Sequence, residues 1–174
     1  MNVVLEKWPD SYDLLNDLYA SADQSHCLVR LPVPLPGEQT EGYLKIIREE
    51  QNEGRPFHCF AIKLSGTVIG KAELTCDPDG TAEMDIILKK EYCGKGYGTA
   101  AVNLLCEMAQ ENRWCRQVEA YADSENLPAL NMLAKAGFRR YRSFRADVMS
   151  GSERTYRIEQ RKGYEYIRTL EQLW

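Results

Sequence analysis

The residues best suited to chemistry form a glycine-rich segment near the middle of the chain, Tyr92-Cys93-Gly94-Lys95-Gly96-Tyr97-Gly98-Thr99. Its glycines allow successive backbone N–H groups to point into one concavity. A helical pattern follows at once, and the first amides of a helix are unpaired and lie at the positive end of its dipole. The segment therefore predicts an anion-binding turn, whose most suitable ligand is the phosphate of a cofactor.

The spacing of these glycines leaves other interpretations open. No window of the chain fits the P-loop pattern G-x-x-x-x-G-K-[ST]. Residues 96–101 fit the dinucleotide pattern G-x-G-x-x-A, and Glu119 lies about 20 residues further on, where a ribose-binding acid is expected. However, residues 89–93 separate the glycines from the preceding apolar run, whereas a dinucleotide turn follows its strand directly. A purely structural turn is the remaining alternative.

Two carboxylates lie on the apolar run before the turn, a run that should form the middle strand of a sheet. Because alternate strand residues point to opposite faces, Glu83 and Asp85 share one face. If this face is buried beside a cofactor, the acids could accept a proton. The alternatives are that the face opens on solvent or that basic residues pair the acids. Glu73, on the preceding run, is a third acid whose orientation relative to these two the sequence leaves open.

The composition excludes several classes of protein. A chain of 174 residues predicts a single domain, 1–174. With 22 basic and 26 acidic residues, the net charge of −4 argues against a nucleic-acid or membrane-surface binder and favours a cationic partner. The six cysteines and two histidines have no metal-ligand spacing, so we expect reduced thiols and no metal. Without a signal-peptide pattern or a run of transmembrane length, the chain is expected to be soluble and cytoplasmic.

The hydrophobic pattern predicts the elements that must position these residues. Residues 3–5 predict a strand, and a helix follows residue 10. The proline-rich segment 30–37 predicts a loop, and Thr40 is the expected N-cap of the next helix. Three strands joined by tight turns follow as an antiparallel meander, over residues 57–64, 67–75 and 81–88.

The second half predicts a parallel crossover and then a hairpin. A helix after the glycine turn, a strand over residues 117–121 and a helix over residues 126–136 imply a right-handed crossover. Strands over residues 138–148 and 154–160 are expected across a turn at residues 150–152, with a short helix from residue 163 to the end. The basic and aromatic run 139–145 fits a solvated strand face better than RNA contact.

Together these elements predict an α/β fold. We expect a mixed, mostly antiparallel central sheet of about seven strands with helices on both faces. The change from meander to crossover falls beside the glycine turn, and ligands favour such changes of strand order.

The chain resembles the GNAT superfamily of acetyl-coenzyme A-dependent N-acetyltransferases. The loop of that family is [QR]-x-x-G-x-[GA], which residues 93–98 fit except at the first position. Its later signature is similar to Asn126-Leu127-Pro128-Ala129 and Lys135-Ala136-Gly137-Phe138. The resemblance covers most of residues 57–148, and the most similar branch contains ribosomal-protein and polyamine N-acetyltransferases. An aminoglycoside-type acetyltransferase is the alternative within the superfamily.

The resemblance implies roles for particular residues. The backbone of residues 93–99 would hold the pyrophosphate of acetyl-CoA, and Ile86, Ile87 and Leu88 would run alongside its pantetheine arm like an added strand. Asn126 would bind that arm or cap the following helix. Glu83, with Asp85 behind it, would take a proton from a primary amine, which then attacks the thioester in a ternary complex. The amine would belong to a small molecule or peptide, such as a polyamine or a protein N-terminus.

Two positions depart from the family pattern. Cys93 replaces the usual Gln or Arg, but the backbone supplies the phosphate contacts, so cofactor binding is still expected. Leu133 stands where many relatives have a tyrosine that protonates the departing thiolate, a role that leucine cannot take. Cys93 is also a rival nucleophile, because a helix N-terminus lowers the pKa of a thiol. Because Leu133 cannot protonate the thiolate, a non-catalytic module that binds acyl-CoA stays an alternative. We expect a monomer or a homodimer.

Overall fold

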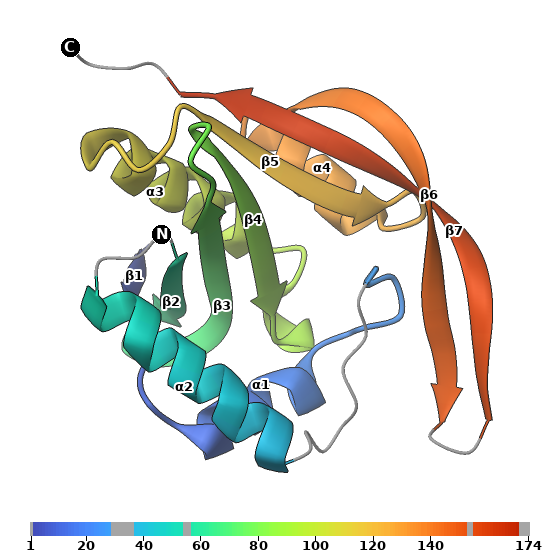
Figure 1. The fold of residues 1–174 in the computed structure, drawn as a ribbon, viewed down its shortest axis with the longest axis horizontal. Helices are drawn as coiled ribbons and strands as arrows, with labels where there is room; N and C mark the ends of the chain where they lie inside the picture. The colour runs from blue at the N-terminus through green and yellow to red at the C-terminus, as the bar shows by residue number, and fades with distance from the viewer. Residues whose placement is uncertain (1, 29–36, 54–56, 153–154, 171–174) are drawn as a thin grey trace.

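The computed structural model describes residues 2–28, 37–53, 57–152 and 155–170. The predicted proline-rich loop lies outside these ranges except for Gly37. In chain order (Figure 1), the elements are β1 (Val3–Lys7), α1 (Tyr12–Ser21), α2 (Gly37–Glu53), β2 (Phe57–Leu64), β3 (Thr67–Cys76), β4 (Thr81–Leu88), a 3-10 turn η1 (Lys90–Tyr92), α3 (Tyr97–Glu111), β5 (Gln117–Asp123), α4 (Leu127–Lys135), β6 (Arg139–Ser152) and β7 (Thr155–Thr169).

The strands form one seven-stranded sheet in the order β1-β2-β3-β4-β5-β7-β6. All neighbours are antiparallel except β4 and β5, which are parallel. The pairing of β4 with β5 begins at Thr81 and Gln117 and ends at Glu83 and Glu119, after which the two strands diverge (Figure 1). The predicted mixed, mostly antiparallel sheet of about seven strands is thus confirmed, and its one parallel step opens into a fork.

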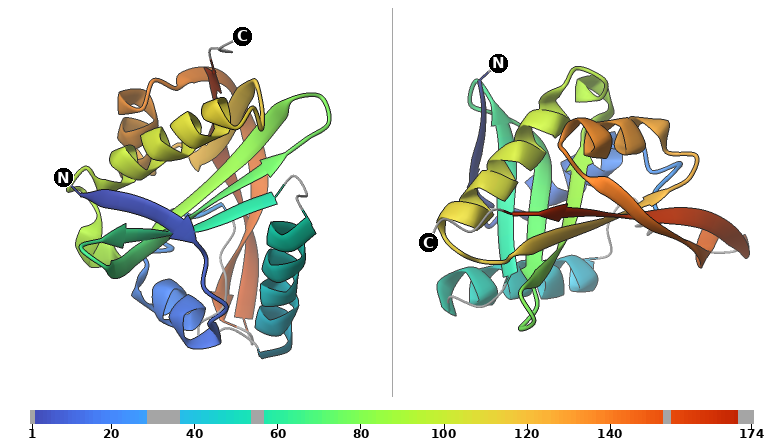
Figure 2. Two further views of the ribbon diagram at one scale, coloured as in Figure 1. Left: turned by 90° about the vertical axis from the view of Figure 1, so that its left-hand side faces the viewer. Right: turned by 90° about the horizontal axis from the view of Figure 1, so that it is seen from above.

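Helices cover both faces of the sheet, with α1 and α2 on one face and α3 and α4 on the other (Figure 2). The core beneath α3 and α4 contains buried aliphatic residues such as Ile62, Leu74, Val102, Leu105 and Val118. A smaller core beneath α1 and α2 contains Leu15, Leu18, Leu44, Ile47 and Ala61. The predicted alternation of strand residues between two faces therefore places the even-numbered residues of β4 toward α3 and α4.

Side chains and glycines fix the ends of the helices. The Ser11 hydroxyl accepts a hydrogen bond from the Leu14 amide at 3.2 Å and caps α1. Gly96 is in the left-handed conformation, with φ of 84°, immediately before α3. Gly137 follows α4 with φ of 80°, as the predicted helix stop requires. None of the helices in the described ranges is both long and apolar enough to cross a membrane.

Several element boundaries differ from the sequence predictions. Helix α2 begins at Gly37, so Thr40 is a buried residue inside the helix rather than its N-cap. Residues 150–152, predicted as a turn, are the last residues of β6.

The predicted C-terminal helix from residue 163 is wrong, because β7 continues to Thr169 and pairs with both β5 and β6. Gly163 lies under the Phe144 ring, where an added Cβ would come within 2.3 Å of the ring. This cross-strand packing, which short-range pattern does not reveal, keeps the segment extended.

Candidate active site

The fork between β4 and β5 opens a cavity of about 740 Å³. Its lining comes from the segment after α1 (Gln24, His26, Cys27, Leu28), from α1 itself (Tyr19), from β3 (Glu73, Thr75), from residues 83–87 of β4, from residues 120–123 of β5, from α4 and its cap (Asn126, Ala129, Met132, Leu133) and from β6 (Phe144, Ala146, Asp147). Because the lining includes residues from both faces of the sheet, the cavity passes through the sheet. Its size falls in the range of small-molecule sites, about 300–1,000 Å³.

The free edge of β4 forms one wall of this passage. The paired residues of β4 and β5 end at Glu83 and Glu119, so the backbone of the later β4 residues has no partner in β5. Ile86 and Ile87 line the cavity, whereas Leu88 lies at the point where β4 leads into the glycine turn. An unpaired strand edge offers alternating N–H and C=O groups to an extended ligand.

The glycine turn has the geometry that its sequence predicts. Gly94 and Gly96 both have positive φ, 73° and 84°, and helix α3 begins at the next residue, Tyr97. Gly98 lies in the first turn of α3 against α4, where an added Cβ would be 2.8 Å from the sulfur of Met132. Met132 lines the cavity, whereas none of residues 93–99 does, so this helix end meets the wall of the passage through the contact of Gly98 with Met132.

The acids of β4 lie on one face, as their spacing predicts. In the register with β3, Glu73 is directly opposite Asp85, so all three carboxyls share that face, and all three line the cavity. The expectation that this face is buried is wrong for Glu83 and Asp85, which are exposed. The core beneath α1 and α2 reaches Ile87 and ends before Asp85.

Electrostatics distinguish Glu83 from an ordinary surface acid. Partial burial raises the pKa of its carboxyl, and the charges of Asp85 and Glu119 add to the effect. Glu119 is directly opposite on β5. An acid with a raised pKa in a cleft is suited to accepting a proton.

Sequence analysis did not identify the most deeply buried charged group of the site. Lys71 is 1% exposed, and its Nζ lies 3.0 Å from Oε2 of Glu73, which is 9% exposed. The Tyr43 hydroxyl of α2 donates to Oε1 of Glu73 and accepts from Lys71. A signal was present, because Lys71 and Glu73 interrupt an apolar run at the spacing that places them on one face.

Asn126 acts as a helix cap. Its Oδ1 accepts a hydrogen bond from the Ala129 amide at 3.2 Å, and its Nδ2 donates to the His26 carbonyl at 3.4 Å. Of the two roles that the resemblance implies, the structure shows the capping role. Leu133, from the same helix, is buried and lines the cavity wall.

The structure argues against the alternative in which Cys93 is an activated nucleophile. Partial burial and the nearby negative charge of Asp23 raise the pKa of its thiol. The sulfur lies 3.6 Å from the Lys89 carbonyl, to which the thiol donates. The side chain is thus turned back toward η1, away from the N-terminal amides of α3 that were expected to stabilise a thiolate.

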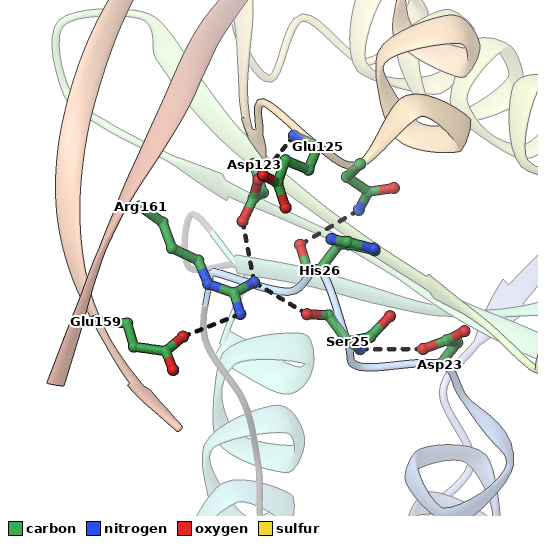
Figure 3. A network of polar contacts seen from close by, with 8 residues as sticks. Asp23, Ser25, His26, Asp123, Glu125, Glu159 and Arg161 are labelled. Carbon is green, nitrogen blue, oxygen red and sulfur yellow. Dashed lines mark hydrogen bonds and ion pairs between the residues drawn. The ribbon is translucent and has the colours of Figure 1, made fainter. Parts of the chain in front are cut away.

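The segment after α1 is clamped against the cavity by Arg161 of β7 (Figure 3). The Arg161 guanidinium donates to the Ser25 carbonyl at 3.0 Å and to the buried Asp123 carboxylate at 3.1 Å. His26, Asp123 and Glu125 have their ligand atoms within 4.8 Å of one another, the spacing of a metal site. Because Arg161 already pairs with Asp123, we interpret this group as a structural clamp.

Comparison with known proteins identifies the family. A family model described as an acetyltransferase (GNAT) domain matches residues 2–139. No curated protein matches the chain.

Solved structures share the fold at low sequence identity. Spermidine N-acetyltransferase from Vibrio cholerae, in complex with CoA and spermine, is 13% identical, with 97% of this chain and 95% of that chain covered and a TM-score of 0.76. RimL, a ribosomal L7/L12 alpha-N-protein acetyltransferase in complex with coenzyme A, is 12% identical, with coverages of 98% and 95% and a TM-score of 0.78. The protein yncA from Salmonella typhimurium, with its cofactor acetyl-CoA, is 14% identical, with coverages of 97% and 94% and a TM-score of 0.75.

Proposed function

Because the chain belongs to the GNAT family of acetyltransferases, we propose that it transfers the acetyl group of acetyl-CoA to a primary amine by direct attack in a ternary complex. The observation that carries this proposal is the fork between β4 and β5. Along the fork, β4 has a free edge beside a cavity lined by carboxylates, and the chain continues from the end of β4 to the glycine turn and the N-terminus of α3. Such an arrangement holds an extended anionic donor and a cationic acceptor end to end.

The proposed cofactor site uses backbone groups. The amides of residues 93–99 hold the pyrophosphate, because two positive-φ glycines and the first turn of α3 direct N–H groups into one concavity. Ile86, Ile87 and Leu88 pair with the pantetheine arm along the free edge of β4, and Asn126 contacts the arm while it caps α4. When bound, acetyl-CoA supplies the activated acetyl group.

The proposed chemistry needs a base and an oxyanion donor. Glu83, with Asp85 beside it, takes a proton from the acceptor ammonium, since a protonated amine has no lone pair for attack. A backbone amide near Ile87 or Leu88 polarises the thioester carbonyl and stabilises the tetrahedral oxyanion. Positioning of the two substrates supplies much of the remaining rate, and no covalent enzyme intermediate is required. The raised pKa of Cys93 supports this direct route over one through a cysteine.

The proposed acceptor is a primary amine of a small molecule or a peptide. Five acids line the cavity, Glu73, Glu83, Asp85, Asp123 and Asp147. Glu73 pairs with Lys71 and Asp123 with Arg161, and the exposed acids Glu83, Asp85 and Asp147 favour an acceptor that arrives as a cation. The similar structures include enzymes named for spermidine and for a ribosomal protein. Polyamines and protein N-termini are thus the first acceptors to test. We further propose that the protein acts in the cytoplasm as a monomer or a homodimer. None of the six cysteines, all within the described residues, forms a disulfide, which fits a reducing compartment.

A second candidate function rests on Leu133. This buried side chain lines the cavity and has no proton to give to a departing thiolate. A module that binds acyl-CoA without transferring the acyl group would share the fold, because fold does not guarantee chemistry. Release of CoA that depends on an added amine distinguishes the two functions.

Replacement of the proposed base tests the mechanism. The release of CoA from acetyl-CoA is followed with a thiol reagent against a panel of N-terminal peptides, polyamines and aminoglycosides. With the best amine, Glu83→Gln should lower kcat by roughly 10²-fold, because the amide cannot accept the proton. The affinity for CoA should stay the same.

Glu107→Gln, the same change on the exposed part of α3, is the matched control and should leave kcat unchanged. Equal turnover in the Glu83 and Glu107 variants would remove Glu83 from the mechanism.

A further inference from the structure

Glu73 is a buried carboxyl at the wall of the cavity that the proposed reaction has not yet used. It faces ionisable groups from five elements, which are Tyr19 of α1, Tyr43 of α2, Cys59 of β2, Lys71 of β3 and Asp85 of β4. A buried acid paired with a lysine usually has a structural role. This one, however, also lines the cavity beside two exposed acids, so a ligand in the cavity can reach it.

The carboxyl of Glu73 is held in place and keeps acceptor capacity. Tyr43 donates to one oxygen, and Lys71 lies 3.0 Å from the other. The Lys71 ammonium is itself fixed, 4.7 Å from the centre of the Tyr43 ring and 5.4 Å from the centre of the Tyr19 ring. Because a carboxylate has about four lone pairs, two stay free for a group in the cavity.

The surroundings of Glu73 bring the pKa of its carboxyl close to neutral pH. Burial, followed by the negative charge of Asp85, raises the pKa of Glu73 to about 8. Burial also raises the pKa of Tyr19 far above its ordinary value and the pKa of Cys59 to about 12, so these neighbours keep their protons. Burial also lowers the pKa of Lys71, so Glu73 and its partner Lys71 are the two groups of this cluster whose pKa values are shifted toward neutral pH.

Acetyl transfer to an ammonium requires two separate proton removals, a point that rests on the proposed function. The ammonium loses one proton to become a nucleophile, and the nitrogen loses a second after the C–N bond has formed. Glu83, which is exposed, can pass the first proton to water. The second proton has to reach the sulfur if CoA is to leave as a thiol, and Leu133 on the α4 wall has no proton to offer.

We propose that Glu73 is a second acid–base residue of the reaction. It takes the proton that the acceptor nitrogen loses after the C–N bond forms, and it returns this proton to the sulfur as the C–S bond breaks. The carbonyl carbon gains nitrogen and loses sulfur, CoA leaves as a thiol, and Glu73 ends in its starting state. Tyr43 and Lys71 are positioning residues that hold its carboxyl.

The match of acidities supports this exchange. A thiol has a pKa of about 8.5, close to the value of about 8 for Glu73, so a proton moves between them with little free-energy difference in either direction. A general acid–base group is most effective when its pKa lies near the working pH.

The pH dependence of kcat tests the proposal with two variants. With a saturating amine, kcat is measured from about pH 6 to about pH 9.5, a range that brackets the pKa of Glu73. Because Glu73 must be ionised to accept the proton, kcat of the wild type should rise with pH through the ionisation near pH 8. Glu73→Gln should lower kcat by roughly 10²-fold and remove this rise from the profile. Tyr43→Phe removes a donor to the ionised carboxylate, which raises the pKa of Glu73, and should move that ionisation to higher pH.

Independent readouts separate failure of this proposal from failure of the proposed function. CoA should raise the melting temperature of both variants as it does for the wild type, which establishes that the site is folded. Glu83→Gln should be slow but keep the ionisation of Glu73 in its profile. An unchanged profile in both Glu73→Gln and Tyr43→Phe would overturn the role of Glu73. Absence of amine-dependent CoA release in the wild type would instead overturn the proposed function.

Discussion

The acidic residues that share one face of β3 and β4 differ in their chemistry. Glu83 and Asp85 are exposed, whereas Glu73, directly opposite Asp85, is 9% exposed and lies against Lys71. The difference arises because α1 and α2 cover one end of this face and leave the other end at the cavity. Exposure thus suits Glu83 and Asp85 to attracting a cation, whereas burial suits Glu73 to changing its charge near neutral pH.

Cys93 gives a prediction at the same scale. Because its pKa is raised, only a small fraction of its thiol is ionised near neutral pH, and the thiolate is the reactive form. Alkylation by iodoacetamide, followed for the Cys93 peptide by mass spectrometry, should be slower than for a free cysteine with a pKa of about 8.5. Asp23→Asn removes a nearby negative charge and should accelerate the reaction. Faster alkylation of Cys93 than of a free cysteine at pH 7 would instead support a reaction route through a Cys93 nucleophile.

At the scale of elements, α4 links helix capping to the cavity through Asn126. Loss of its cap in Asn126→Ala should reduce the free energy of unfolding by about 1 kcal/mol, measured with urea. Asn126→Ser keeps a capping oxygen and should recover most of this loss. If both variants also bind CoA more weakly, the amide contacts the cofactor, and an unchanged affinity in both would limit Asn126 to capping.

Ser11 provides the matched control for this experiment. It caps α1 through the same kind of bond, from the Leu14 amide at 3.2 Å, and it does not line the cavity. Ser11→Ala should therefore cost about as much stability as Asn126→Ala and leave the affinity for CoA unchanged.

The elements were predictable from sequence wherever local pattern decides their structure. The meander of β2, β3 and β4 follows from alternating residues and two tight turns, and α3 and α4 follow from amphipathic spacing and the glycines beside them. The last part of β7 was not predictable, because its extended form depends on pairing with β5 and β6 on both sides. The contacts of Glu73 with Lys71 and Tyr43 were not predictable either, because Tyr43 lies 30 residues from Glu73 in the chain and only the fold brings them together.

At the scale of the whole molecule, the cavity lies where β5 leaves β4 but stays paired with β7. This strand pairs with β7 along its full length, from Gln117 to Asp123, but with β4 over only its first residues. Beyond Glu119, β5 therefore follows the long hairpin of β6 and β7 rather than β4, and the fork lies between the two directions (Figure 1). The glycine turn and the acids of β4 were visible in the sequence, but the space between them depends on strands that come much later in the chain.

A binding measurement tests whether this fork and the glycine turn form one cofactor site. At a concentration of CoA near 100 times its dissociation constant, binding to the folded state should stabilise the protein by about 2.7 kcal/mol. For a chain of this size, that corresponds to a rise of roughly 5–10 °C in melting temperature. NADH should have no such effect, because the sheet is not the parallel sheet of a dinucleotide-binding fold.

Two substitutions of Gly96 separate the backbone conformation of the turn from its charge. Gly96→Asn keeps a residue that tolerates the left-handed conformation, here φ of 84°, and should retain much of the CoA-dependent shift. Gly96→Glu adds a negative charge and a side chain where the phosphates are expected, and should abolish the shift. The melting temperatures of the two variants without ligand report the backbone strain that each adds, so a difference between their CoA-dependent shifts reports on the ligand. If the Glu variant keeps the full shift, the phosphates bind elsewhere, and the free edge of β4 would have to account for CoA binding without the turn.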